Sequence, residues 1–170
     1  DMRMGAWEMQ LPEKRDEETY PVDLWYVTQV EAAFVPADLK LMIDGFKGSG
    51  YTLYVNGREV TETPVRSYLD AEIKTVPLSG YFVEGTNTIA VKLTVTKKSD
   101  GMVDLLKLTG TFAVAEADGV ERIVPLPGTL ELGDWVRQQL PYYSGTVYYT
   151  AKVALDQEQL QRKLMLRADV

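Results

Sequence analysis

The chain contains no cysteine and no histidine among its 170 residues. Without cysteine it forms no disulfide, no thiolate nucleophile and no zinc–thiolate site. Without histidine it has no Ser-His-Asp or Cys-His catalysis and no imidazole metal ligand. The chemistry that remains is that of carboxylates, Lys and Tyr side chains, an oxygen-ligated calcium ion, or binding without catalysis.

Long hydrophobic runs are also missing from the sequence. No apolar stretch approaches the roughly 20 residues that cross a bilayer, and no basic region followed by an apolar one opens the chain, so we expect neither a membrane span nor a signal peptide. The net charge is −7 and the pI is about 4.7. Because an acidic surface repels phosphate backbones, nucleic acid is not an expected partner.

The sequence does contain short segments in which apolar and polar residues alternate, as they do in half-buried β-strands. Between residues 89 and 96 every second side chain is apolar: Ile89, Val91, Leu93 and Val95. Asn56-Gly57 divides residues 51–60 in two, and this dipeptide accepts the positive φ angles of a two-residue hairpin turn. The pattern predicts a protein built from β-sheets, each of which buries one face in the core and exposes the other to solvent.

Further strands are expected throughout the chain, whereas only one short helix is expected, over 134–140 with Asp134 as its N-cap. The other predicted strands cover residues 25–35, 39–43, 71–76, 103–115, 120–125, 145–155 and 163–168. Trp25 and Tyr26 open the first of these strands, and we interpret both as core residues. This count predicts an all-β fold with little helix, an antiparallel β-sandwich of the jelly-roll type.

The domain organisation follows from the same pattern. Residues 1–24 are expected to form an irregular lead-in and residues 25–145 a β-sandwich domain. The remaining residues, 146–170, either close that sandwich or begin a second, incomplete one, because 147–153 resembles 24–30 in sequence. We favour closing strands, since an unpaired opening strand would expose a sheet edge.

Three motifs in this order resemble a known family: Asp23-Leu-Trp-Tyr26, Tyr54-Val-Asn-Gly57 and Gly85-Thr-Asn-Thr-Ile89. Together they are similar to the galactose-binding-domain-like β-sandwich, and more narrowly to the sugar-binding jelly-roll domain of family 2 glycoside hydrolases and related bacterial rhamnosidase-type enzymes. Later segments, including Gly133-Asp-Trp135 and residues 141–149, resemble the linker region of such enzymes. The resemblance covers about residues 20 to 155.

The resemblance implies a non-catalytic carbohydrate-binding accessory module of a larger bacterial glycoside hydrolase, extracellular or at the cell surface. Its expected partners are a polysaccharide or oligosaccharide and the neighbouring domains of the parent enzyme. Sugar sites combine aromatic faces with polar side chains. The candidate ligand-binding residues are Tyr68, Tyr81, Trp135, Tyr142, Tyr143, Arg66 and Asp70.

Other functions are weighed against sugar binding. The alternative is a structural β-sandwich that packs against neighbouring domains and binds no sugar; a weaker one is an adhesion module with a protein partner. Independent catalysis is not expected, because no nucleophile elbow, phosphate loop or dinucleotide fingerprint occurs.

No cofactor is expected. The resembled family often carries a structural calcium ion, but no calcium-loop motif supports one here. Asn56 and Asn87 are interpreted as turn residues.

Overall fold

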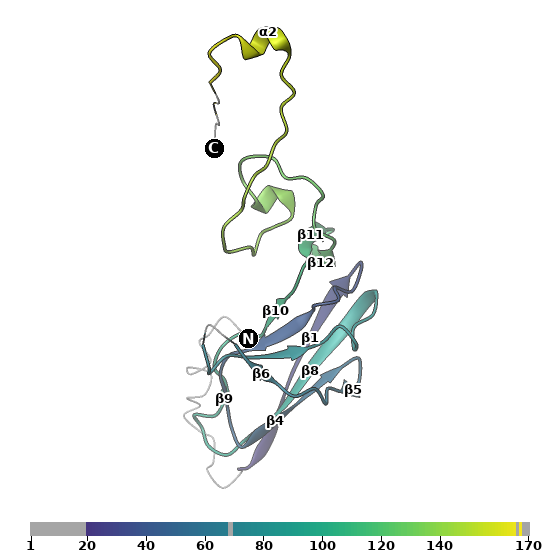
Figure 1. The fold of residues 1–170 in the computed structure, drawn as a ribbon. Helices are drawn as coiled ribbons and strands as arrows, with labels where there is room; N and C mark the ends of the chain where they lie inside the picture. Colours follow the sequence, from purple (N-terminus) through teal and green to yellow (C-terminus); the bar gives the residue numbers. More distant parts are fainter. Residues whose placement is uncertain (1–19, 68–69, 166, 168–170) are drawn as a thin grey trace. The chain divides into compact units, whose positions relative to one another are not determined.

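The computed structural model describes residues 20–67, 70–165 and 167 (Figure 1). The chain divides into two compact units between Pro125 and Leu126. The strands of the described residues all belong to the first unit, and the second unit contains only two short helical segments. The predicted lead-in over 1–24 ends earlier than expected, since the first strand begins at Val22; residues 1–19 lie outside the described part.

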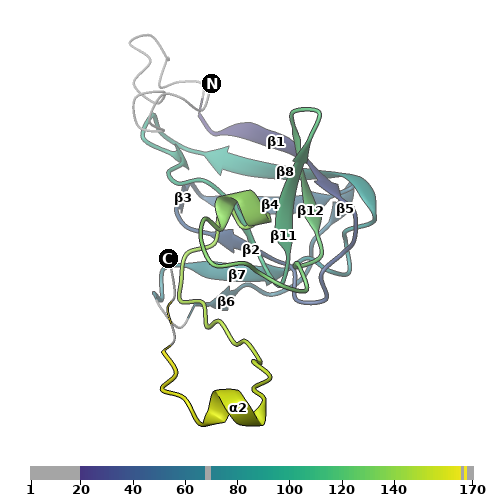
Figure 2. The same cartoon turned by 90° about the horizontal axis from the view of Figure 1, so that it is seen from above.

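The first unit contains two main sheets. The larger sheet has the spatial order β11 (Ala113–Ala117), β12 (Val120–Val124), β1 (Val22–Ala32), β8 (Gly85–Val95), β4 (Gly50–Val55) and β5 (Arg58–Glu59). The smaller sheet has the order β10 (Lys107–Thr109), β2 (Lys40–Ile43), β7 (Lys74–Pro77) and β6 (Val65–Arg66), part of which Figure 2 shows side by side. A short pair, β3 (Phe46–Lys47) with β9 (Gly101–Met102), completes the unit.

The hydrophobic core lies between the two main sheets. From β8, Ile89 and Val91 are buried against Leu41 of β2 and Val76 of β7 in a single cluster. The predicted all-β sandwich with little helix is therefore confirmed. The pairs are antiparallel except β1 with β12, which are parallel, and the finer jelly-roll assignment stays a prediction.

The pairing of β1 with β8 is the longest in the fold. All eleven residues of β1 have partners on β8, from Val22 opposite Val95 to Ala32 opposite Gly85. Alternation places Tyr26 toward the core, where its hydroxyl accepts a hydrogen bond from the Met102 amide at 3.2 Å. Trp25 must then point outward, and it is 55% exposed. The interpretation of Trp25 as a core residue was wrong, because neighbouring residues of one strand face opposite sides.

Two asparagine side chains join the turn after β4 to the loop before β8. Asn87 is fully buried, and its Nδ2 donates to the carbonyl oxygens of Val83 and Gly85 at 2.7 and 3.0 Å. Its Oδ1 accepts from the Val83 amide and from Asn56 Nδ2, both at 2.8 Å. Asn56 has a φ of 52° at the predicted hairpin turn and accepts from the Thr88 amide at 2.9 Å. The interpretation of Asn56 as a turn residue is confirmed. Asn87 instead lies within β8, where its buried side chain bonds to the backbone of the preceding loop.

The strand predicted over 103–115 is broken in the structure. The chain leaves the smaller sheet after β10 and enters the larger sheet at β11, so one straight strand cannot span both. Gly110 occupies the crossing point, where a Cβ atom would lie 3.3 Å from the Leu39 Cα. The Asp38 carboxylate fixes the next residue by accepting from the Thr111 amide and hydroxyl at 2.9 and 2.8 Å.

The second unit differs most from the prediction. No strand forms over 145–155 or over the described part of 163–168, so these segments supply no closing strand. A strand with the right alternation still needs a neighbouring strand to hydrogen-bond, and these segments have none in the described chain. The predicted helix over 134–140 is reduced to one 3₁₀ turn, η2 (Val136–Gln138), and a short helix, α2 (Gln157–Leu160), follows.

We expect Asn87→Ala to destabilise the first unit by about 3 kcal/mol, because it removes a fully buried side chain together with its four hydrogen bonds to Val83, Gly85 and Asn56. Urea unfolding followed by circular dichroism measures this loss. Thr88→Ala on the same strand is the matched control and should cost about 0.5 kcal/mol or less. Equal losses in the two variants would show that the Asn87 amide is not the anchor.

Candidate functional site

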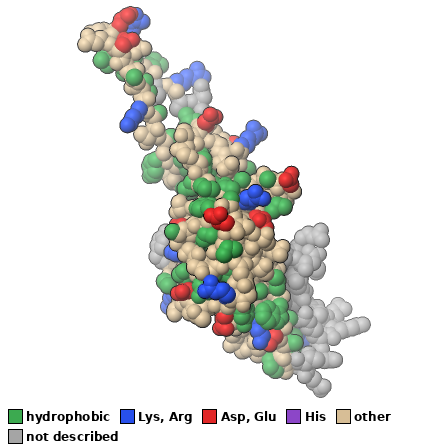
Figure 3. Space-filling model, turned by 90° about the vertical axis from the view of Figure 1, so that its right-hand side faces the viewer, with side chains coloured by type: hydrophobic (Ala, Val, Ile, Leu, Met, Phe, Trp, Pro, Cys, Tyr) green, Lys and Arg blue, Asp and Glu red, His purple; other side chains and the backbone are tan. Residues whose placement is uncertain are grey.

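The outer face of the larger sheet carries the most ordered group of exposed side chains in the first unit. Over the surface drawn in Figure 3, acidic, basic and hydrophobic side chains are interspersed. The outward positions of β1, β8 and β4 instead align in rows, because the registers place Trp25 opposite Lys92 and Lys92 opposite Thr52. In the next row Val27 faces Ala90, which faces Tyr54.

Two aromatic rings meet on this face and form what we call the aromatic platform, Trp25 and Tyr54. Their ring centroids lie 5.6 Å apart with an interplanar angle of 33°. The rings come from β1 and β4, which are separated by β8, so their backbones lie about 10 Å apart. The small side chain of Ala90 leaves the space over β8 across which the rings approach. The platform is a shallow, tilted aromatic surface open to solvent.

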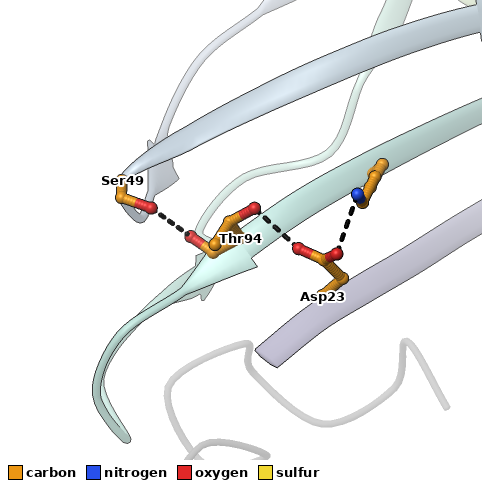
Figure 4. A network of polar contacts seen from close by, with 4 residues as sticks. Asp23, Ser49 and Thr94 are labelled. Carbon is orange, nitrogen blue, oxygen red and sulfur yellow. Dashed lines mark hydrogen bonds and ion pairs between the residues drawn. The ribbon is translucent and has the colours of Figure 1, made fainter. Parts of the chain in front are cut away.

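A polar rim borders the platform on one side. Lys92 Nζ lies 2.8 Å from the Asp23 carboxylate, and Thr94 Oγ1 donates to the same carboxylate at 2.7 Å. Figure 4 shows Asp23 beside Thr94, with Ser49 bonded to the backbone carbonyl of Thr94 at 3.4 Å. These bonds fix donors and acceptors beside the rings without removing them from solvent, since the Lys92 and Asp23 side chains are 36% and 42% exposed.

The rim residues have shifted pKa values for a local reason. The hydrogen bond from Lys92 holds the pKa of Asp23 below its usual value, and the bond from Thr94 adds to this. The same hydrogen bond with Asp23 raises the pKa of Lys92, with a smaller contribution from Tyr54. Both groups are therefore charged over the neutral pH range, and the rim presents a fixed ion pair.

The arrangement fits binding better than glycoside hydrolysis at this face. Hydrolysis uses two carboxyl groups about 5 to 10 Å apart. The acidic residues that β1 directs outward are Asp23 and Glu31, which are separated by eight residues, or about 26 Å along a strand. Glu31 is already bonded to the Thr86 hydroxyl. The face offers an apolar surface and hydrogen-bonding groups rather than a carboxylate pair.

No metal centre is evident at this face. Within residues 20–67, 70–165 and 167, no three His, Cys, Asp or Glu side chains are grouped so that they could hold an ion. A calcium ion held partly by backbone carbonyls stays an expectation from the family resemblance.

The described candidate residues of the first unit lie on two segments, with Arg66 and Asp70 on the β6–β7 hairpin and Tyr81 in the loop before β8. Tyr81 is half-buried against the core, where its hydroxyl accepts from the Thr61 amide at 3.3 Å. Arg66 is exposed at the end of β6. Asp70 accepts from the Glu72 amide at 2.9 Å, as a turn residue does. The fourth candidate in this unit, Tyr68, lies outside the described residues.

The second unit brings two of its candidate aromatics together. The rings of Trp135 and Tyr143 meet edge to face with centroids 5.6 Å apart. The Trp135 indole N–H donates to the Tyr149 hydroxyl at 2.6 Å, and the Tyr143 hydroxyl donates to the Thr146 carbonyl at 2.9 Å. Tyr142 is 69% exposed. The Trp135 ring is thus engaged with neighbouring tyrosines, whereas the Trp25 ring is presented outward.

Sequence reasoning missed Trp25 and Tyr54, although the signal was present. Trp25 shares its parity along the first strand with the polar residues Gln29 and Glu31, so the alternation places all three on one face. An aromatic residue on the polar face of an alternating strand indicates an exposed ring. On β4, Leu53 and Val55 face the core, so Tyr54 between them faces the opposite, outer side of the sheet.

Comparison with known proteins does not assign this chain to a family. No protein-family model matches this chain, and a search of curated proteins finds no similar sequence. Within the described residues, the helices are too short to span a bilayer.

The ion pair predicts a measurable pH dependence. Because the pKa of Asp23 is lowered in the folded chain, the interaction stabilises the fold above the ordinary aspartate pKa and is lost as pH falls through the folded value. In an NMR titration of carboxyl carbons, we expect Lys92→Met to move the Asp23 midpoint toward the ordinary value. The midpoint of Asp38, which is lowered by bonds from Thr111, is the control and should not move. An unchanged Asp23 midpoint would contradict the pairing.

Proposed function

We propose that the first unit is a non-catalytic carbohydrate-binding module that holds sugar rings on the aromatic platform. The observation that carries this proposal is the pairing of the exposed Trp25 ring with the half-buried Tyr54 ring beside a fixed polar rim on one sheet face. The resemblance to galactose-binding-domain-like sandwiches supports the same function. With it comes the proposal that the chain serves a bacterial glycoside hydrolase outside the cell.

The chemistry of the platform matches a sugar with equatorial hydroxyl groups. Such a ring presents C–H bonds on its faces, which pack against aromatic rings, and hydroxyl groups on its edge, which hydrogen-bond polar side chains. The Asp23 carboxylate accepts hydrogen bonds, and the Lys92 ammonium donates them. Because these two charges neutralise each other, we expect the sugar ring bound beside the rim to be uncharged.

The size of the platform sets the expected affinity. Covering one face of each ring removes about 150 Å² of apolar surface from water, which contributes about 4 kcal/mol. Because association also costs several kcal/mol of translational and rotational freedom, the expected dissociation constant is millimolar or weaker. The platform is open rather than enclosing, so hydrogen bonds from the rim stay in competition with water and add little. The proposed module is therefore a weak binder of extended chains.

Trp25→Ala is expected to weaken binding of cellotetraose, a linear β-linked oligosaccharide with equatorial hydroxyls, by about thirtyfold, since it removes the larger ring of the platform. Titration calorimetry with excess sugar measures the change. Trp135→Ala is the matched control, because it removes a tryptophan that is engaged with Tyr143 and Tyr149. Loss of binding only in Trp135→Ala would place the sugar in the second unit and contradict the platform.

A second function, packing against neighbouring polypeptide, is favoured by a specific feature of the second unit. The segment 147–155 alternates like a strand, yet Tyr148 is 89% exposed and Val153 is 72% exposed. Side chains of this kind suit a surface that another polypeptide covers. The sugar titration separates the two functions: a folded chain that binds none of a panel of neutral polysaccharides would favour the packing role.

A further inference from the structure

A shallow cavity of about 450 Å³, wide open to solvent, lies at one end of the larger sheet, between residues 46–49 and residues 96–100. The first segment leads from β3 into β4, and the second follows the last residue of β8. The cavity is lined by Lys47, Ser49, Thr96, Lys97, Ser99 and Asp100, with Phe46 and Gly48. Its lining is mostly polar, in contrast to the aromatic platform.

Backbone contacts hold both walls of this cavity in place. The Ser49 amide donates to the Thr94 carbonyl at 3.0 Å, which ties the first wall to β8. At Gly48 a Cβ atom would lie 2.5 Å from the same carbonyl oxygen, so only glycine permits this approach. In the second wall, the Asp100 carboxylate accepts from the Thr96 amide and hydroxyl at 2.8 and 2.9 Å. The cavity is therefore a built feature of the fold.

The cavity presents positive charge on a chain whose net charge is −7. Lys47 and Lys97 are exposed along its lining. The carboxylate in the lining, Asp100, is buried and occupied by Thr96, whose amide hydrogen bond holds the pKa of Asp100 below its usual value. Asp100 stays ionised and interacts electrostatically with Lys97, so the lining, with two lysines and one aspartate, carries a net charge of +1. Lys47, Lys97 and the Ser99 hydroxyl are the groups of this lining that a carboxylate ligand would meet.

The cavity is continuous with the polar rim of the platform. Ser49 lines the cavity and bonds to the Thr94 carbonyl, and the Thr94 side chain bonds to Asp23, as Figure 4 shows. Lys92 beside the platform and Thr96 in the cavity are four residues apart on one strand and its end, or about 13 Å. An oligosaccharide of a few units spans that distance.

We propose that this cavity, named here the lysine cavity, binds the carboxylate of an acidic sugar unit in a chain whose neighbouring units lie on the aromatic platform. The inference rests on the proposed function and narrows its substrate class to oligosaccharides that contain uronic acid. Two lysines act as point charges that suit one carboxylate. The acidic surroundings disfavour ligands with dense charge, such as a nucleic acid.

The test compares two sugars that differ at one hydroxymethyl group. Cellotetraose is the neutral probe, and its acidic counterpart is the same tetramer with one terminal glucose replaced by glucuronic acid. At low salt we expect the acidic tetramer to bind about fivefold more tightly, the effect typical of two exposed ion pairs. The advantage should vanish in Lys47→Met/Lys97→Met, which keeps the side-chain length, and in about 1 M salt, where charges are screened within about 3 Å.

Two controls separate the cavity from general charge effects. Lys40→Met removes one exposed lysine from β2 of the other sheet and should leave the fivefold advantage unchanged. Binding of cellotetraose should be the same in the wild type and the double lysine variant, since neither lysine belongs to the platform. Thermal unfolding of each variant reports whether it folds.

The outcomes distinguish this inference from the proposed function. Equal binding of the two tetramers, or an advantage that survives in the double lysine variant, overturns the lysine cavity and leaves the platform standing. Failure of both tetramers to bind the folded wild type overturns the carbohydrate-binding function and the cavity with it. Acidic-tetramer binding that needs both lysines but persists in Trp25→Ala supports the cavity and contradicts the platform.

Discussion

The fully buried amide of Asn87 is the contact on which the rest of the first unit depends. Its four hydrogen bonds fix the loop that precedes β8 and, through Asn56, the turn that follows β4. The end of β4 and the start of β8 are therefore held at one anchored point. Since a slip of one residue would turn every side chain of a strand to the opposite face, this anchor also protects the register. An orphaned amide would be costly in this dry site, which favours the single arrangement.

The register then decides what the sheet offers to solvent. Eleven paired residues of β1 and β8 direct Tyr26 to the core and expose Trp25, and the adjacent pairing of β4 places the half-buried Tyr54 on the same outer face as Trp25. The same strands carry the Asp23–Lys92 pair beside the rings. Where β8 ends, the chain bends into the loop that forms one wall of the lysine cavity. The apolar, polar and cationic parts of the proposed binding surface are thus successive positions along one strand pairing.

Local sequence signals predicted the fold better than they predicted the site. The Asn56-Gly57 turn and the alternation of 89–95 depend on neighbouring residues, and the structure confirms both. The strand pattern of 145–155 failed because strand formation depends on a partner that the described chain does not provide. Trp25 was wrongly interpreted as a core residue because its aromatic side chain was given more weight than its position in the alternation of the strand. The lysine cavity was beyond sequence reasoning, because Lys47 and Lys97 are far apart in the chain and meet only through the pairing of Ser49 with Thr94.

The most direct test of the account is a ¹⁵N-labelled NMR titration with cellotetraose at millimolar concentration. The account predicts that the indole N–H signal of Trp25 moves together with amide signals of residues 52–54 and 90–94. The indole signal of Trp135 should stay in place. Movement confined to Trp135 and its surroundings, or no movement at all in a folded chain, would contradict the central claim that the outer face of the larger sheet binds sugar.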